Sequence, residues 1–116
     1  MPYLDCLGMQ QLHPGTLDLL VLQALKRQAL HGYAIAAKLK EASADVLSIE
    51  EGTLYPALHR MERRGWLASE WGQTPSGRRA RFYSVTEEGT AHFKQERTEW
   101  KKHSVMVGRM LGVKLA

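Results

Sequence analysis

Hydrophobic residues recur at helical spacing directly after Pro14 and Gly15, and this pattern predicts a first helix that continues to about Gln28. We expect Thr16 to cap this helix and Asp18, in its first turn, to interact favourably with the helix dipole. The residues that form its predicted core stripe are Leu17, Leu20, Val21, Ala24 and Leu25. Leu19 and Leu22 lie off this stripe, so the helix has more apolar surface than one core requires. A second buried contact, such as a subunit interface, would explain the excess.

Two further helices are predicted before the middle of the chain. The second begins after His31-Gly32 and ends near residues 42–44, and its inward residues are expected to be Tyr33, Ile35, Ala36 and Leu39. The segment from Ser48 to Glu51 matches a capping box and predicts the start of a third helix, which stops at Gly65. Its predicted core stripe is Leu54, Leu58 and Met61. Pro56 conflicts with a regular helix there, so either the first turn is irregular or the helix begins closer to Gly52.

A hairpin and a long last helix are predicted after Gly65. Short aromatic stretches at 66–71 and 81–85 flank a segment, 72–77, that is rich in turn-forming residues. Thr86 is expected to cap a final helix that continues to about Leu111, with Glu87 and Glu88 in its first turn. Six residues of this helix alternate at spacings of four and three, which is typical of a helix-helix seam: Phe93, Arg97, Trp100, Ser104, Val107 and Leu111.

These elements predict a mainly α fold with a small β-hairpin wing (α+β), that is, a winged helix-turn-helix followed by a long C-terminal helix. The expected parts are an N-terminal arm at 1–13, a winged helix-turn-helix domain at 14–85 and a dimerisation helix at 86–116. A long helix with no partner left in so small a domain predicts a second subunit. The residues expected at the dimer interface are Leu19, Leu22, Phe93, Trp100, Val107 and Leu111.

Composition indicates what kind of partner and which cellular compartment to expect. The chain has 116 residues, and its 16 Lys and Arg exceed its 12 Asp and Glu, an excess that matters only if it is gathered on one face. One cysteine, Cys6, excludes an intramolecular disulfide and fits a reducing cytoplasm. The densest apolar run, 17–25, is interrupted by polar residues and is too short to span a bilayer. We therefore expect a cytoplasmic protein with no membrane segment.

Two neighbouring elements gather the positive charge. The third helix should present a polar face opposite its core stripe, made by Thr53, Tyr55, Pro56, His59, Arg60 and Arg63. An ordinary solvated helix face would explain this set equally well. The wing is more telling, because Arg78, Arg79 and Arg81 stand close together with no acid among them. Phosphate groups would relieve their repulsion and bind arginine in a bidentate way, so the two elements together favour DNA binding.

An enzyme is not expected. The histidines share no metal-ligand spacing, and they are His13, His31, His59, His92 and His103. No zinc-protease motif, glycine-rich phosphate loop or arrangement of nucleophile and base is found in the sequence. We therefore predict no catalytic residue, no metal and no cofactor.

Trp100 admits two interpretations. The simpler is a core or dimer-interface aromatic residue, because buried tryptophans mainly supply contact area. The other is an effector pocket in which two copies of Trp100 approach across the dyad and enclose a planar aromatic ligand beside Arg97.

Four motifs carry a family resemblance, and they follow one another along nearly the whole chain. They are Gly15-Thr-Leu-Asp-Leu-Leu-Val-Leu22, His31-Gly-Tyr-Ala-Ile35, Gly52-Thr-Leu-Tyr-Pro-Ala-Leu-His-Arg60 and Arg81-Phe-Tyr-Ser-Val-Thr-Glu-Glu-Gly89. At these residues the sequence resembles the PadR family of bacterial transcriptional regulators. The resemblance implies a homodimeric winged helix whose third helix and wing contact an operator, with the last helix making the dimer.

The chain is similar to the short branch of that family. Its drug-sensing members carry a tryptophan at the place of Trp100, but Arg97, Lys101 and Lys102 indicate either an anionic ligand or no pocket here. The resemblance thus implies a dimeric repressor that binds a pseudo-palindromic operator in double-stranded DNA and is released by a small molecule, such as an aromatic effector, or by another signal. Two alternatives stay open: a winged-helix module for protein-protein interaction without operator binding, and a small-molecule carrier without DNA contact.

Overall fold

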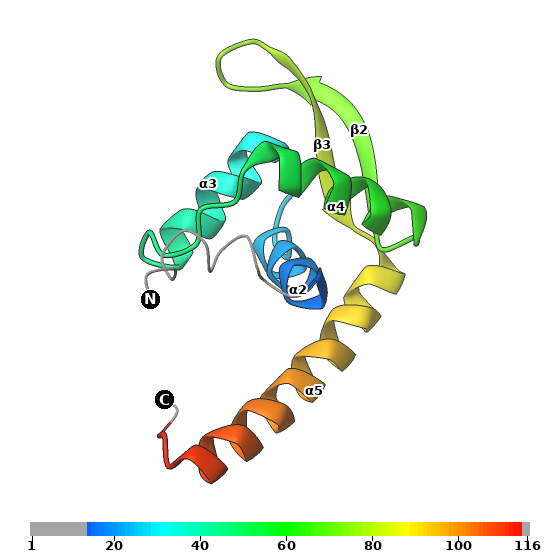
Figure 1. Ribbon diagram of the computed structural model, residues 1–116. Coiled ribbons are helices and arrows are strands. Elements are labelled where there is room, and N and C mark those ends of the chain that lie inside the picture. Colours follow the sequence, from blue (N-terminus) through cyan, green and yellow to red (C-terminus); the bar gives the residue numbers. More distant parts are fainter. Residues whose placement is uncertain (1–13, 115–116) are drawn as a thin grey trace.

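The computed structural model describes residues 14–114. The predicted N-terminal arm, with Cys6 and His13, lies outside the described residues. The elements are α2 (Pro14–Ala24), β1 (Leu30–His31), α3 (Gly32–Ala42), α4 (Glu51–Arg63), β2 (Leu67–Gln73), β3 (Arg79–Val85) and α5 (Glu87–Leu111). The strands form an antiparallel sheet in the order β1-β3-β2, and α5 extends away from the other elements (Figure 1). The predicted α+β fold is confirmed.

The core lies where α2, α3 and α4 meet the base of the sheet. Its largest fully buried side chains are Val21, Leu22, Ile35, Leu54, Leu58, Met61 and Tyr83. The predicted stripe of the third helix is therefore confirmed. Leu22 was expected to lie off the core and to meet a second subunit, and that placement is wrong, because 1% exposure leaves its side chain no surface for a partner.

The bounds of the first helix differ from the prediction. Helix α2 begins at Pro14, a residue suited to a first helical position because its missing N–H would have no partner there. Thr16 therefore lies inside the helix instead of capping it, and the helix ends at Ala24, not near Gln28. Asp18 lies beyond the first turn and is buried, so the expected interaction with the helix dipole is wrong.

Three local features of the next segment also differ. Leu30 and His31 form the short strand β1, paired with Tyr83 and Phe82 of β3, and two residues are too few to show a period in the sequence. Tyr33 was expected to face inward but is 69% exposed. The predicted capping box is wrong, because Glu50 is the N-cap of α4 and makes no side-chain capping hydrogen bond. Helix α4 begins at Glu51, close to Gly52, and keeps Pro56 inside it.

The joint between the sheet and α5 is tightly built. Thr86 caps α5 as predicted: its Oγ accepts from the Gly89 N–H at 3.0 Å and its hydroxyl donates to the Gly65 carbonyl at 2.6 Å. A Cβ on Gly89 would lie 2.1 Å from the carbonyl oxygen of Trp66, so only glycine allows this approach. The indole of Trp66 also stacks on His92 of α5, with 3.7 Å between ring centroids. The first turns of α5 are thus fixed to the rest of the protein.

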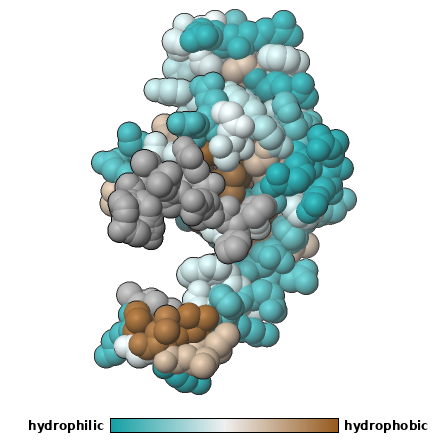
Figure 2. All heavy atoms as spheres, in the orientation of Figure 1, coloured by the Kyte–Doolittle hydropathy of each residue, from teal (hydrophilic) through white to brown (hydrophobic). Residues whose placement is uncertain are grey.

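The remainder of α5 differs from its start. Phe93 is 8% exposed and packs into the core, so the predicted seam begins inside the protomer. Farther along, large apolar side chains face solvent, and the last part of the helix carries a continuous hydrophobic patch (Figure 2). The large apolar side chains exposed beyond Phe93 are Trp100, Val105, Met106, Met110, Leu111 and, just after the helix, Val113. Val107 of the predicted seam is half-buried.

Candidate nucleic-acid interface

One side of α4 is free for a partner. Leu54, Ala57, Leu58 and Met61 bury its other side, and the helical period then turns the residues between them outward. Of the six residues predicted on its polar face, four are exposed: Thr53, Pro56, His59 and Arg63. A hydroxyl, an imidazole and a guanidinium group are therefore presented together along one helix face, and each can hydrogen-bond the edge of a base.

Arg60 does not belong to this free face. Its guanidinium forms an ion pair and hydrogen bond with the Asp18 carboxylate of α2, whose side chain is only 8% exposed. Burial raises the pKa of Asp18 above its ordinary value, although the adjacent Arg60 lowers it. Arg60 therefore fastens α4 to α2, because a buried carboxylate requires a charged partner, and a DNA contact at Arg60 stays a prediction.

Tyr55 is also partly used inside the protein. Its ring packs on the core, and its phenol lies so close to Gly32 that an added Cβ there would approach the Tyr55 oxygen to 2.5 Å. Gly32 is thus required at the start of α3 because the tyrosine of α4 occupies the space of a side chain. Tyr55 positions α3 against α4, and only part of its surface remains for another molecule.

The wing carries its arginines in two different states. Arg81 donates two hydrogen bonds to the Ser69 hydroxyl, one from Nε and one from a terminal guanidinium nitrogen. The same terminal nitrogen lies 3.6 Å from a Glu62 carboxylate oxygen. The expectation of an acid-free arginine cluster is therefore wrong for Arg81, because an acid from α4 reaches it. Arg78 and Arg79, by contrast, have no carboxylate within 4.0 Å among residues 14–114.

The strand register turns these groups towards α4. Trp71 is paired with Arg81, and Gln73 with Arg79, and side chains two residues apart share a face of a sheet. This face also carries Ser69, which donates to the Glu62 carboxylate of α4 at 2.7 Å. The Arg79 and Arg81 guanidinium groups lie 4.6 Å and 5.5 Å from the centroid of a Trp71 ring. The β2–β3 hairpin extends beyond α4 (Figure 1). The register places the Arg79 and Arg81 side chains on the sheet face that Ser69 joins to that helix.

Three contributors to this surface were missed in the sequence. Trp71 supports two wing arginines, and its cross-strand position opposite Arg81 would have shown this once the hairpin register was known. Glu62 and Asp18 each neutralise one predicted DNA contact. No local pattern reveals the Asp18–Arg60 contact, because the two residues are far apart in the chain and meet only when α2 packs on α4.

The predicted effector residues lie in different surroundings. Arg97 lines a cleft beside α2, whereas Trp100 is 54% exposed and does not line that cleft. Among residues 14–114, no group of three or more histidine, cysteine or acidic side chains is placed to hold a metal ion. No helix in the same range is long and apolar enough to cross a membrane.

The fold and its surface define a winged helix-turn-helix protein: α3 and α4 form the helical pair, and the β2–β3 hairpin is the wing. Comparisons with known proteins agree. Residues 21–95 match the model of the transcriptional regulator PadR-like family. The chain is 33% identical over 89 residues to the transcriptional regulator Rv3488 of Mycobacterium tuberculosis, which covers 77% of this chain and 79% of that protein.

Solved structures give the same result. A PadR family transcriptional regulator from Eggerthella lenta is 35% identical, with a TM-score of 0.73 over 86% of this chain and 85% of that one. A transcriptional regulator from Clostridium thermocellum is 28% identical, with a TM-score of 0.74 over 82% of this chain and 92% of that one. The chain belongs to the PadR-like family of transcriptional regulators.

Proposed function

We propose that the protein is a homodimeric repressor that binds a pseudo-palindromic operator through α4 and the wing. The proposal rests on two neighbouring groups of exposed residues. Thr53, His59 and Arg63 are exposed on α4, and Arg78 and Arg79 are exposed on the hairpin, where the register puts Arg79 on the sheet face that Ser69 joins to α4. In a winged helix, the recognition helix can place the α4 residues at base edges, and the cationic loop beside it can place the wing arginines at phosphates.

The apolar end of α5 supports the proposed dimer. In an isolated protomer the side chains beyond Phe93 face water, with Trp100 54% and Leu111 71% exposed. Such an apolar surface is expected at an interface between subunits and is unfavourable in a monomer. Pairing of this helix with its copy would hold two winged helices at a fixed separation. Two recognition helices can then enter successive major grooves on one face of the duplex. We also propose that a small molecule or other signal releases the repressor from its operator.

A competitor-DNA assay tests this function. Duplexes selected from a random pool by the protein should contain a dyad-symmetric sequence, and an excess of random duplex should not displace them. The leading alternative, a winged helix that binds an acidic protein partner, predicts no preference among duplexes of equal length. Arg78→Ala with Arg79→Ala should lower binding to all duplexes if the protein binds DNA. If it is instead a small-molecule carrier, this variant should still bind its ligand.

A further inference from the structure

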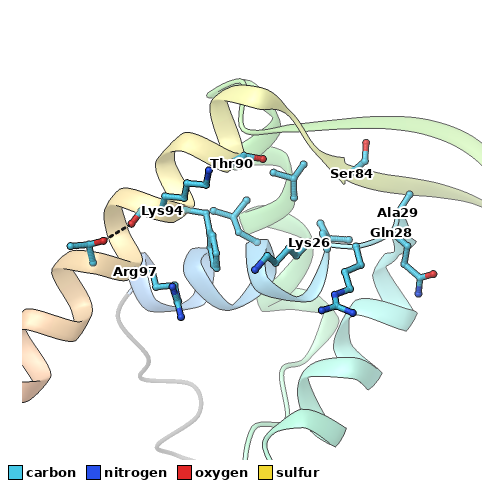
Figure 3. Close-up of a pocket in the computed structure, with 13 residues that line it drawn as sticks. Lys26, Gln28, Ala29, Ser84, Thr90, Lys94 and Arg97 are labelled. Atoms are coloured by element: carbon cyan, nitrogen blue, oxygen red, sulfur yellow. Dashed lines mark hydrogen bonds between the residues drawn. The ribbon is translucent and has the colours of Figure 1, made fainter.

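Trp71 in β2 is a large aromatic residue whose position the core does not explain. Its side chain is 56% exposed, and in the described part of the chain it neither belongs to the core nor packs against it. Two other rings that lie near a cation are placed differently. Phe93, whose ring centroid lies 5.8 Å from the Lys26 ammonium at a cleft beside α2 (Figure 3), is a core residue, and Trp66 packs against the core. Packing therefore accounts for those rings and not for Trp71.

Two arginines lie near the Trp71 ring, and their surroundings differ. Arg81 donates to the Ser69 hydroxyl and lies beside the Glu62 carboxylate of α4, so its donors are already engaged. Arg79 has no carboxylate within 4.0 Å over the described length of the chain. Its guanidinium carbon lies 4.6 Å from the centroid of a Trp71 ring. The indole, and not an acid, therefore lies against the Arg79 charge.

An indole can orient a guanidinium group without using its donors. The N–H groups of arginine lie in the plane of the guanidinium, so a ring against its face leaves them free for hydrogen bonds. The attraction between the cation and the electron-rich face of the ring favours this arrangement. The strand register supports it, because Trp71 is paired with Arg81, and Arg79 lies two residues before Arg81 on the same face of the sheet. Arg79 is therefore both oriented and free to bind an anion.

We propose that Trp71 is a positioning residue that holds the Arg79 guanidinium in the orientation in which it binds a DNA phosphate. This role rests on the proposed function, because it requires the wing to contact DNA. A free arginine side chain loses rotamer freedom when it binds, and an arginine that is already oriented loses less. Trp71 thus strengthens a phosphate contact without adding charge. Through Arg81 and Glu62 the same ring is also connected to α4, so the wing cation is held in register with the recognition helix.

The orientation of Arg79 can be measured by NMR in the free protein. A proton near the face of an indole is shielded by the ring current, so the Arg79 Nε–H resonance should lie upfield of its usual position. Trp71→Leu keeps an apolar side chain but removes the ring, and it should return this resonance to the usual position. The Nε–H resonance of Arg78, the residue before β3, should be the same in both proteins. An Arg79 resonance that does not respond to Trp71→Leu would overturn the proposal.

DNA binding tests whether this orientation matters. Trp71→Leu should lower the affinity for the selected duplex about threefold for each bound protomer, the size of an exposed cation–π interaction. The slope of log affinity against log salt concentration should stay the same, because the Arg79 charge is still present. Arg79→Ala, by contrast, should reduce the slope. In the Arg79→Ala background Trp71→Leu should have no further effect, whereas in the Arg78→Ala background it should keep its full effect.

Trp71→Phe is the matched control, because it keeps an aromatic face at this position and should retain most of the wild-type affinity. An affinity as low as that of Trp71→Leu would show that the ring face does not matter and would overturn the proposal. So would an effect of Trp71→Leu that persists without Arg79, because Trp71 would then be a DNA contact itself. A fall in salt slope like that of Arg78→Ala with Arg79→Ala would mean that the wing had lost its shape, which also overturns the positioning role. If no duplex is bound at all, the proposed function fails, while the Nε–H resonance still decides whether Trp71 orients Arg79.

Discussion

The winged helix and the far end of α5 use similar apolar residues in opposite ways. Val21, Ile35 and Leu58 are completely enclosed within the protomer, whereas Met110 and Leu111 are 80% and 71% exposed. Phe93 lies at the boundary, because it belongs to the helical seam by its spacing and to the core by its burial. Helical periodicity thus predicts which face of a helix is apolar, but it does not say whether the partner of that face lies in the same chain.

The basic surface divides in a similar way. Arg60 and Arg81 have carboxylate partners in the protein, from Asp18 and Glu62. Arg63, Arg78 and Arg79 have no such partner within the described part of the chain. We infer that the first two hold the interface in shape and that the other three are available to an external anion.

The largest effect is expected at the end of α5. Val107→Glu with Leu111→Glu should give a folded monomer, because both residues lie far from the core of the winged helix. Loss of the second half-site should lower operator affinity about 100-fold or more, as expected when linked binding events become separate. Sedimentation equilibrium and a binding titration measure the two results.

The opposite face of α5 supplies the control for this variant. Val105→Glu with Arg109→Gln makes the same change in net charge at exposed residues that lie about half a turn around the helix from Val107 and Leu111. We expect that protein to remain dimeric. Dissociation of this control, or a dimer that survives the change at Val107 and Leu111, would show that the seam was assigned to the wrong face.

Arg60→Ala should have the next largest effect, on stability. It leaves the buried Asp18 without a partner, and we expect a loss of about 3 kcal/mol, the low end for a broken buried pair because Arg60 is 31% exposed. Arg63→Ala removes the same group from the exposed face and should change the free energy of unfolding by less than about 0.5 kcal/mol. Urea unfolding of the two variants compares the roles directly.

The pH dependence of that loss follows from Asp18. Its pKa is already raised by burial, and removing Arg60 takes away the main influence that lowers it. The folded variant therefore holds the Asp18 proton more tightly than the wild type, so its extra instability should grow as pH rises through the raised Asp18 pKa of the folded wild type, which lies above the ordinary value of 3.8. At lower pH Asp18 is protonated in both proteins, folded and unfolded, and the difference should shrink. A pH-independent difference would contradict the ion-pair role.

The wing arginines should have a moderate effect on DNA binding. Arg78→Ala and Arg79→Ala should each weaken binding to the selected and to random duplexes equally. Each lost phosphate contact should reduce the slope of log affinity against log salt concentration by about one unit. Arg81→Ala should reduce the slope less, because Glu62 already neutralises part of its charge. Equal slopes for all three variants would remove the distinction between free and paired arginines.

The smallest effect is expected at a base contact. His59 is exposed on α4 and makes no hydrogen bond within the described residues, so His59→Ala should leave stability unchanged. Loss of one hydrogen bond to a base should lower the affinity for the selected operator about fivefold, near 1 kcal/mol, and should hardly change the affinity for random DNA. Tyr55→Ala is a poorer test, because it would also remove the packing on Gly32. Equal weakening of both duplexes would exclude base reading by His59.

The sequence predicts elements better than it predicts contacts. The core stripe of α4, the cap at Thr86 and the hairpin follow from spacing and turn chemistry, because these are local properties. The strand β1 was missed because two residues show no period. Arg60, Tyr55 and Arg81 were placed on the correct side of their elements, but their partners come from distant segments. Tertiary packing, which local periodicity does not encode, decides which of the predicted basic residues remain free.

A hydroxyl-radical footprint on a selected duplex, with the protein-to-DNA ratio measured on the same complex, tests the central claim most directly. A dimer joined through α5 that reads DNA with α4 and the wing predicts two protomers on each duplex. It also predicts two protected stretches related by a dyad and about 10 base pairs apart. A single protected stretch with one protomer bound, or no protection that depends on sequence, would contradict the account.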